Sequence, residues 1–293
     1  MRNMSELVLC SSTELYNILN QSAKLSRLAE PNYLCLLDAR SKREYNESHI
    51  VTARSVKQDE DSFLLPESVE LDCMKYCVVY DSHTNSLFGE GPAIECAKVI
   101  MQICHNPVLV LKGGYEEFSG YYHFFRSQKV FWMPQEIDDF QPHPIEIIPS
   151  LLYLGDCRQA NDRHIQKDLK IKSQVNISLE PTHFSGPTLH IALPDTCESD
   201  LLQFFPSVCT FIDSHMLPAC TVLISSELGI SRSSTVVLAY LIHHRKCTLQ
   251  DAWNHVLKCK NNMRPNRGFV QQLSLWEKTV LGDQMTDISD PKY

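Results

Sequence analysis

The sequence of 293 residues contains no Cys-x-x-Cys pair, and its twelve cysteines are scattered from Cys10 to Cys259 without regular spacing. Zinc sites and small disulfide frameworks both depend on characteristically spaced cysteines, so this distribution argues against either. We expect no metal and no cofactor. We interpret most of the cysteines as reduced thiols that pack as small apolar side chains.

Long apolar segments are also missing, because the longest apolar run, Val236 to Ile242, is too short to cross a bilayer. The first ten residues lack the continuous apolar stretch of a secretory signal. A mitochondrial transit peptide would be rich in arginine and poor in acids, whereas the first thirty residues mix both charges. We therefore expect a cytoplasmic protein without membrane contact, with a mitochondrial pool as the alternative.

There is no surplus of positive charge: the chain has 27 basic and 35 acidic residues, and its formal net charge is −8. This balance argues against a general nucleic-acid-binding protein, whose affinity comes from neutralising phosphates. The composition is that of an ordinary globular protein, with 43% hydrophobic and 21% charged residues. A chain of this length suggests two domains of about 100–200 residues each.

The composition changes in the middle of the chain, where four prolines and a cluster of acids occur between residues 133 and 149. Prolines and acids of this density are typical of a linker. We expect a first domain over residues 1–132, a linker over 133–147, a second domain over 148–282 and a polar tail over 283–293.

Both halves alternate strand and helix patterns. Ser11 to Glu14 resembles a capping box, Pro92 suits the start of a helix through Ile103, and Thr248 offers a further cap. Apolar runs predict strands at residues 33–37, 76–80, 108–111, 151–154, 175–179, 189–193 and 221–224. Helices are expected over 201–216 and 233–244. This alternation predicts an α/β fold in which each domain is a mainly parallel sheet flanked by helices.

The most informative segment runs from Thr221 to Thr235, where a strand leads through a short loop into a helix. Such a loop can point several backbone N–H groups at one centre, and the helix adds its positive dipole end. Arg232 can hold two oxygens of a phosphate, and Gly229 supplies a backbone shape that other residues resist. The alternative is a capped core helix whose arginine pairs with a nearby carboxylate.

This segment resembles the signature loop of the cysteine-dependent dual-specificity phosphatases, His-Cys-x-x-Gly-x-x-Arg-Ser, at Gly229, Arg232 and Ser233. Further segments resemble the same family in the same order, namely residues 148–156, 175–178, 191–195, 264–266 and 271–273. The resemblance implies a phosphate-binding loop made of Ser226, Glu227, Leu228, Gly229, Ile230, Ser231 and Arg232.

Two positions depart from the family pattern: Ser225 replaces the histidine, and Ser226 replaces the cysteine that attacks phosphorus as a thiolate. A helix N-terminus with nearby positive charge can lower the pKa of a thiol to roughly 3.5–7.5. The same environment cannot ionise a serine hydroxyl at neutral pH, so a serine nucleophile needs an adjacent general base. We therefore predict that the chain is not an enzyme.

The resemblance assigns further roles. Asp195 corresponds to the acid that protonates the leaving oxygen, although a plain loop or capping aspartate is the alternative. Ser233 corresponds to the hydroxyl that assists breakdown of the phosphoenzyme, or it is a helix cap. Glu227 occupies a position that is usually not acidic in the family, and a carboxylate beside the anion site opposes phosphate binding.

The first half resembles a rhodanese-like domain, on residues 37–40, Glu44-Tyr45, His49-Ile50, Ala53, 78–80 and 111–118. In sulfurtransferases of this fold a catalytic cysteine follows the strand at 78–80, whereas this chain has Asp81 there. The nearest cysteine, Cys77, lies within the strand. A sulfurtransferase activity is therefore not expected.

A rhodanese-like domain before a dual-specificity phosphatase domain is the layout of the MAP kinase phosphatases, whose first domain docks kinases through arginines. The corresponding stretch, residues 53–61, offers only Arg54 and Lys57 before three acids, which weakens docking to an acidic groove. The pattern most resembles the serine/threonine/tyrosine-interacting-like pseudophosphatases. It implies binding to phosphorylated proteins, kinases or active phosphatases. The alternatives are a scaffold with a vestigial anion pocket and a very weak phosphatase.

Overall fold

The computed structural model describes residues 6–22, 25–59, 62–64, 70–131, 134–137, 140–218 and 220–293. The chain divides into two compact units, Met1–Pro142 and His143–Tyr293, and each has its own sheet and hydrophobic core. No helix in the described ranges is long and apolar enough to cross a membrane.

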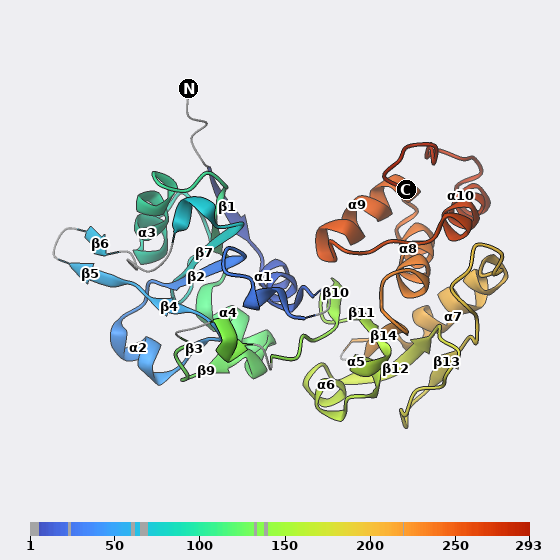
Figure 1. The fold of residues 1–293 in the computed structure, drawn as a ribbon, viewed down its shortest axis with the longest axis horizontal. Coiled ribbons are helices and arrows are strands. Elements are labelled where there is room, and N and C mark those ends of the chain that lie inside the picture. Colours follow the sequence, from blue (N-terminus) through green and yellow to red (C-terminus); the bar gives the residue numbers. More distant parts are fainter. Residues whose placement is uncertain are drawn as a thin grey trace. The chain divides into compact units, whose positions relative to one another are not determined.

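The first unit is built on a five-stranded parallel sheet (Figure 1). Its order is β1 (Leu7–Cys10), β8 (Val108–Leu111), β7 (Tyr76–Tyr80), β2 (Leu34–Asp38) and β4 (Arg54–Ser55). The central strands are almost continuously apolar, as expected for strands that are covered on both faces. Two short antiparallel pairs flank this sheet: β3 (His49–Ile50) with β9 (Arg126–Ser127), and β5 (Lys57–Asp59) with β6 (Ser62–Leu64).

The α-helices described in this unit are α1 (Ser12–Asn20), α2 (Lys42–Glu47), α3 (Pro92–Met101) and α4 (Gly114–Tyr121). The predicted capping box before α1 is confirmed, since the Ser11 side chain accepts from the Glu14 N–H and the Glu14 carboxylate accepts from the Ser11 N–H. Short 3₁₀ helices complete the unit, namely η1 (Arg27–Ala29), η2 (Leu71–Cys73), η3 (His123–Phe125) and η4 (Pro134–Ile137).

The second unit has a five-stranded sheet that is parallel except at one edge. Its order is β10 (Ile145–Ile148), β11 (Leu152–Asp156), β14 (Thr221–Ser226), β12 (Ile171–Asn176) and β13 (Thr188–His190), with β10 antiparallel to β11. The predicted class, a mainly parallel α/β sheet in each domain, is therefore confirmed.

The helices of this unit are α5 (Cys157–Asn161), α6 (Arg163–Asp168), the 3₁₀ turn η5 (Leu202–Phe204), α7 (Phe205–His215), α8 (Arg232–Arg245), α9 (Leu249–Cys259) and α10 (Arg267–Leu281). Helix α8 is central, because it contacts α7, α9, α10 and strands β11 and β14. Its residues are buried from Arg232 to Ile242, which fits the unbroken apolar run from Val236 to Ile242.

Some predicted boundaries were wrong. The expected helix over 201–216 begins with η5 and becomes α-helical only at Phe205, where Pro206 fits the first turn. The strand expected over 189–193 ends at His190. The chain leaves the sheet there, and the Leu193 carbonyl accepts a hydrogen bond from Arg232 instead of pairing with a neighbouring strand.

The second unit begins within the stretch predicted as a linker over 133–147, because β10 starts at Ile145. Ile145 and Ile147 are buried in the core, and the buried Glu146 carboxylate accepts from the Ser150 N–H at 2.8 Å. The core thus needs this apolar strand despite its proline-rich surroundings. Residues 132, 133, 138 and 139, around the expected boundary, lie outside the described residues.

The polar tail expected over residues 283–293 packs on the second unit. The buried carboxylate of Glu277 accepts hydrogen bonds from the backbone N–H groups of Met285 and Thr286 and from the Thr286 hydroxyl. Tyr293 contacts the ring of Trp253 edge-on. A buried carboxylate requires donors, and the tail supplies them.

Candidate functional site

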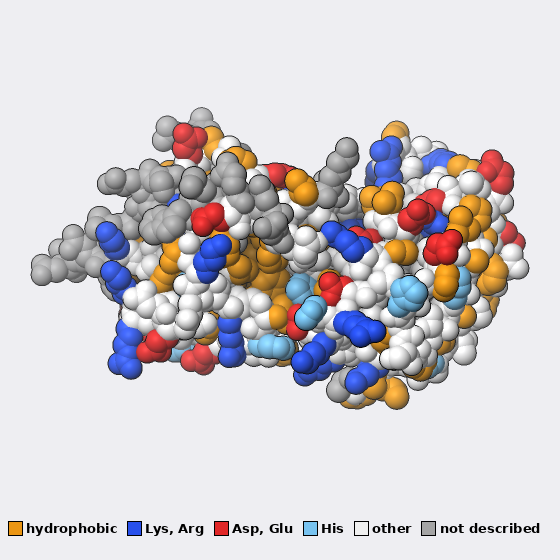
Figure 2. Space-filling model, turned by 60° about the horizontal axis from the view of Figure 1, so that its bottom comes forward, with side chains coloured by type: hydrophobic (Ala, Val, Ile, Leu, Met, Phe, Trp, Pro, Cys, Tyr) orange, Lys and Arg blue, Asp and Glu red, His pale blue; other side chains and the backbone are white. Residues whose placement is uncertain are grey.

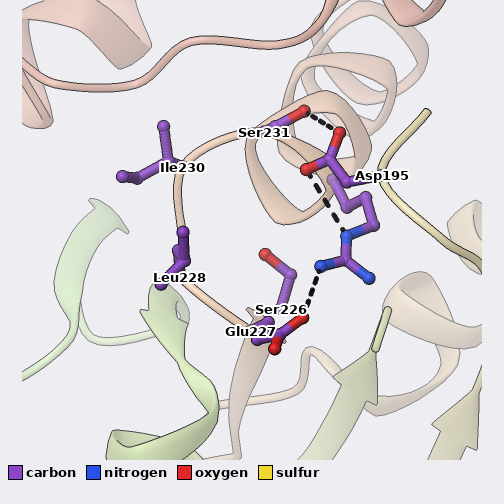
Figure 3. Close-up of a pocket in the computed structure, with 7 residues that line it drawn as sticks. Asp195, Ser226, Glu227, Leu228, Ile230 and Ser231 are labelled. Carbon is purple, nitrogen blue, oxygen red and sulfur yellow. Dashed lines mark hydrogen bonds and ion pairs between the residues drawn. The ribbon is translucent and has the colours of Figure 1, made fainter. Parts of the chain in front are cut away.

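The loop between β14 and α8 forms the candidate site (Figure 3). It turns at Gly229, whose φ of +68° lies in the left-handed region. A Cβ atom at this position would lie 2.7 Å from the carbonyl oxygen of Gly155, at the end of the neighbouring strand β11. Only glycine combines this backbone conformation with so close an approach.

The guanidinium of Arg232 is fixed on several sides, and the residue is only 5% exposed. Its Nη1 donates to the Leu193 carbonyl at 2.8 Å. Its Nη2 donates to Glu227 Oε2 at 3.2 Å, and its Nε lies 3.5 Å from Asp195 Oδ2. Two carboxylates therefore already surround this guanidinium, so the alternative interpretation of an arginine paired with carboxylates describes part of what is found.

Asp195 is held in place by two neutral donors. The Ser231 hydroxyl and the side-chain amide of Asn266 each donate to its Oδ1 at 2.8 Å. Asn266 also caps α10, since its side chain accepts from the Phe269 N–H. Asn266 was given no role from the sequence, although the Arg-Pro-Asn motif that contains it was part of the family resemblance.

Ser226 lies at the end of β14 and is almost fully buried. Its hydroxyl lies 2.8 Å from the Ser233 hydroxyl and accepts from the Ser233 backbone N–H at 3.3 Å. The preceding Ser225 is completely buried, and its hydroxyl has no hydrogen-bond partner in the described part of the chain. The side chain that the Ser226 hydroxyl meets is thus another serine, which is no base.

The pocket has a volume of about 350 Å³ and is lined by Asp195, Ser226, Glu227, Leu228, Ile230, Ser231 and Arg232. Six of the seven predicted phosphate-loop residues thus line it. Gly229 instead packs against the β11 backbone. Figure 3 shows Asp195 and Glu227 on the side of the guanidinium, with Leu228 and Ile230 on the other side of the loop. The formal charge of the lining is −1.

In the first unit, the position that corresponds to the sulfurtransferase cysteine also holds a residue that binds donors of its own loop. Asp81 follows β7, and its carboxylate accepts from the backbone N–H groups of His83, Thr84 and Ala93 and from the Thr84 hydroxyl. Ala93 is at the N-terminal end of α3. The donors of this loop therefore converge on a carboxylate that belongs to the chain itself.

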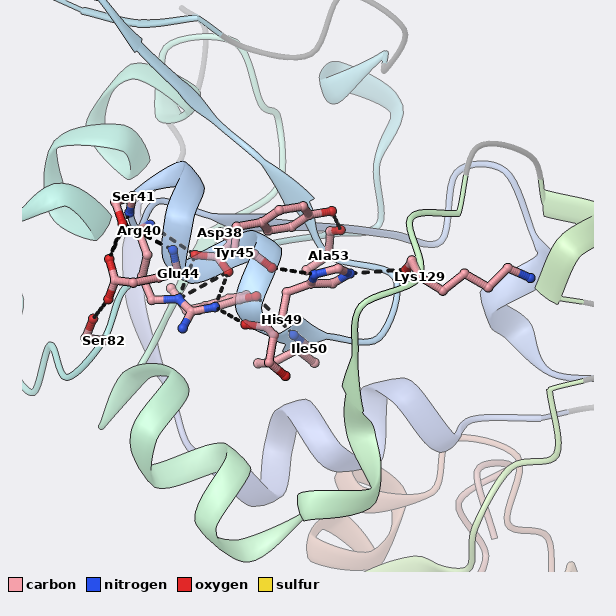
Figure 4. Close-up of polar contacts among 12 residues, drawn as sticks. Asp38, Arg40, Ser41, Glu44, Tyr45, His49, Ile50, Ala53, Ser82 and Lys129 are labelled. Carbon is pink, nitrogen blue, oxygen red and sulfur yellow. Dashed lines mark hydrogen bonds and ion pairs between the residues drawn. The ribbon is translucent and has the colours of Figure 1, made fainter.

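A buried ion pair lies at the end of β2, beside the end of β7 (Figure 4). Arg40 binds both carboxylate oxygens of Asp38, with the shortest contact at 2.6 Å, and its guanidinium lies over the Tyr115 ring at 3.8 Å. Glu44 completes the capping box of α2 with Ser41 and accepts from the Ser82 hydroxyl at 3.2 Å. These contacts position the loop after β7 and leave little of Arg40 accessible.

The stretch that resembles a kinase-docking region lies at the edge of the first sheet. Arg54 is half-buried in β4, and Lys57 is exposed at the start of β5. Residues 60 and 61, two of the three acids expected there, lie outside the described residues. On the face of the described chain drawn in Figure 2, basic, acidic and hydrophobic side chains are interspersed.

Comparison with known families agrees with this division. Residues 152–279 match the model of the dual specificity phosphatase catalytic domain, and residues 20–121 match that of the rhodanese-like domain. The chain carries a rhodanese-like domain followed by a dual-specificity phosphatase-like domain. This order is the one found in MAP kinase phosphatases. The phosphatase-like domain includes every residue of the pocket described above.

The curated relatives of this chain include dual-specificity phosphatases. Mpk3 of Drosophila melanogaster is 36% identical over 147 residues, which cover 48% of this chain and 36% of that protein. Human dual specificity protein phosphatase 4 is 30% identical over 197 residues, which cover 59% of this chain and 50% of that protein. The chain thus spans between about a third and a half of the length of these relatives.

Among solved structures, human DUSP28 is 29% identical, covers 47% of this chain and 95% of its own, and has a TM-score of 0.45. The human tyrosine phosphatase-like serine/threonine/tyrosine-interacting protein is 27% identical, covers 47% and 98%, and has a TM-score of 0.45.

Proposed function

We propose that the chain is a pseudophosphatase, a catalytically inactive dual-specificity phosphatase relative that acts in signalling by binding. The observation that carries this proposal is the environment of Ser226, at the position of the family's cysteine nucleophile. Its hydroxyl is engaged with the hydroxyl and N–H of Ser233. A serine nucleophile needs an adjacent base, and Ser225 in the family's histidine position supplies none.

The loss of the thiolate nucleophile should raise the activation free energy of phosphate-ester hydrolysis. A loop of backbone N–H groups stabilises a thiolate, whose unperturbed pKa is about 8.5, but leaves a serine hydroxyl protonated. Asp195 is retained where the family keeps its general acid, but an acid without a nucleophile cannot start the reaction. We expect a rate lower by orders of magnitude, since each 1.4 kcal/mol of barrier is about tenfold.

The proposed activity is recognition of phosphorylated Ser, Thr or Tyr side chains in protein partners by the Arg232 pocket. Its volume of about 350 Å³ lies near the lower end of the usual range for ligand sites. The partners we propose are phosphorylated proteins, kinases, or the substrates of active phosphatases, for which this chain would compete. For docking of kinases, Arg54 and Lys57 supply only two cations before three acids, so their attraction to an acidic groove is small.

A second candidate is a scaffold whose anion pocket is vestigial. The pairing of Arg232 with Glu227 and Asp195 favours it, because a phosphate must compete with two carboxylates for one guanidinium. Under this alternative, partners bind elsewhere on the chain. Titration of a phosphopeptide against wild type and Arg232→Ala separates the two, because only the phosphate reader loses affinity in the variant.

Hydrolysis of a small aryl phosphate by the purified chain tests the proposed inactivity. We expect no turnover above that of Arg232→Met, and we expect the double variant Ser225→His, Ser226→Cys to gain turnover. Wild-type turnover that Ser226→Ala abolishes would show a true serine phosphatase. An inactive double variant that still folds would show that the pocket itself has lost its catalytic geometry.

A further inference from the structure

Four cysteines meet in the core of the first unit, although they are far apart in the sequence: Cys35, Cys77, Cys96 and Cys104. Cys35 and Cys77 are register partners on β2 and β7. The sulfurs of Cys77 and Cys104 lie 3.4 Å apart, although 27 positions separate them in the chain. This pair is close enough for a hydrogen bond between thiols.

The two thiols of this pair are not equivalent. Cys104 is 7% exposed and Cys77 is 2% exposed. The Cys104 thiol also lies 3.3 Å from the Leu71 carbonyl oxygen. The pKa of Cys104 is lowered because its thiolate can accept from the Cys77 thiol, an effect that outweighs desolvation. The pKa of Cys77 is raised by the same hydrogen bond and by burial.

We propose that Cys77 and Cys104 form a modification site at which a hydroperoxide such as hydrogen peroxide produces a disulfide within the chain. The Cys104 thiolate attacks one peroxide oxygen, the O–O bond breaks, and hydroxide leaves and takes up the thiol proton as water. The Cys77 sulfur then attacks the Cys104 sulfenic acid, the S–O bond breaks, and a second water leaves. Two thiols are oxidised by two electrons, and one peroxide is reduced to two waters.

The backbone around the pair suits this reaction. Cys77 is held in β7 between β2 and β8, whereas Cys104 lies beyond the last residue of α3, in the connection to β8. A disulfide requires the sulfurs to approach by about 1.4 Å, to the usual 2.03–2.05 Å. We assign this movement to the connection, which is not bound into the sheet.

Peptide mapping of the full chain tests the proposal directly. The chain is treated with graded hydrogen peroxide, its remaining thiols are alkylated, and it is digested without reduction for mass spectrometry. We expect a linked pair of peptides containing Cys77 and Cys104, formed before other linkages and lost after dithiothreitol. Complete alkylation of Cys104 after oxidation, or a first disulfide between another pair, would overturn the proposal.

Two variants define the roles of the partners. In Cys77→Ser, which keeps a hydrogen-bond donor beside the Cys104 sulfur but cannot form a disulfide, a sulfenic acid at Cys104 should persist and react with dimedone. In Cys35→Ala, the matched control from the same core, the linkage of Cys77 to Cys104 should form as in wild type. Far-UV circular dichroism verifies that each variant is folded. A folded Cys77→Ser that gives no dimedone adduct at Cys104 would contradict the assigned order of attack.

Discussion

At the scale of single residues, both domains have loops whose donors are engaged by carboxylates of the chain itself. Asp81 accepts the N–H groups of the loop after β7, and Glu227 and Asp195 neutralise Arg232. A carboxylate is a chemically reasonable substitute for a bound oxyanion because both accept from backbone N–H and guanidinium donors. The two loops can therefore keep their shape without a ligand.

Removal of the negative charge at position 227 should strengthen phosphate binding. Glu227 is largely exposed, so its ion pair with Arg232 contributes only about 0–1 kcal/mol, and a phosphate can displace it. For Glu227→Gln we expect a phosphotyrosine peptide to bind about three- to tenfold more tightly than to wild type, since repulsion by the carboxylate is also removed. Isothermal titration calorimetry at low salt measures the change.

The matched control for this prediction is Glu198→Gln, which removes an equal charge from an exposed residue that does not line the pocket. It should change affinity much less than Glu227→Gln. In an Arg232→Ala background, Glu227→Gln should have a smaller effect, because only the repulsion between the carboxylate and the phosphate remains to be removed. Equal gains from both glutamine variants would mean that net charge, and not competition for Arg232, controls the affinity.

A methyl group at Gly229 should destabilise the second domain. Gly229→Ala combines a positive φ with a contact of 2.7 Å to the Gly155 carbonyl oxygen. Gly282→Ala is the matched control, because its φ is +91° but nothing lies within 4 Å of the added atom. We expect a loss of about 1 kcal/mol for Gly282→Ala and at least about 2 kcal/mol for Gly229→Ala in urea unfolding. Equal losses would show that the loop yields to the clash.

At the scale of secondary-structure elements, local sequence patterns predicted several helix and strand boundaries. The capping box at Ser11 and the run Tyr76–Tyr80 both correspond to the observed boundaries of α1 and β7. Strand β10 was missed because its four residues lie among prolines that indicate a linker. The short helices α5 and α6 were missed because they have too few turns to show an apolar periodicity.

Asn266 links the start of α10 to the candidate site, because its side chain caps this helix and also donates to Asp195. Asn266→Ala should reduce the free energy of unfolding by about 1 kcal/mol through the lost cap. Asn266→Ser keeps a capping oxygen but cannot reach Asp195 in the same way, so it should stay within a few tenths of wild type. Chemical denaturation followed by tryptophan fluorescence compares them. A similar loss in both variants would assign the effect to the Asp195 contact.

At the scale of the whole molecule, the sequence predicted most of the residues that line the pocket but not all of their contacts. Gly229, Arg232 and Asp195 belong to motifs whose residue types and spacing can be read directly from the sequence. The engagement of Arg232 by the Leu193 carbonyl depends on where β13 ends, which is a tertiary property. The scattered cysteines likewise gave no sign that four of them share one core.

The division of the chain into two units leads to a test of where the second one begins. A fragment of residues 143–293 contains β10, whereas a fragment of residues 149–293 lacks it. Burial of Ile145 and Ile147 contributes about 3–6 kcal/mol together, which is comparable to the stability of a whole domain.

We expect the longer fragment to unfold cooperatively in urea and the shorter one to be insoluble or to lack a cooperative transition. The double variant Ile145→Ser, Ile147→Ser in the longer fragment is the control, because it keeps the chain length and the backbone pairing of β10 with β11 but removes the apolar burial. If apolar burial is the main contribution of β10, this variant should behave like the shorter fragment. Cooperative unfolding of residues 149–293 at the same urea midpoint as residues 143–293 would show that β10 is not needed. The second domain would then begin after the linker that the prolines predicted.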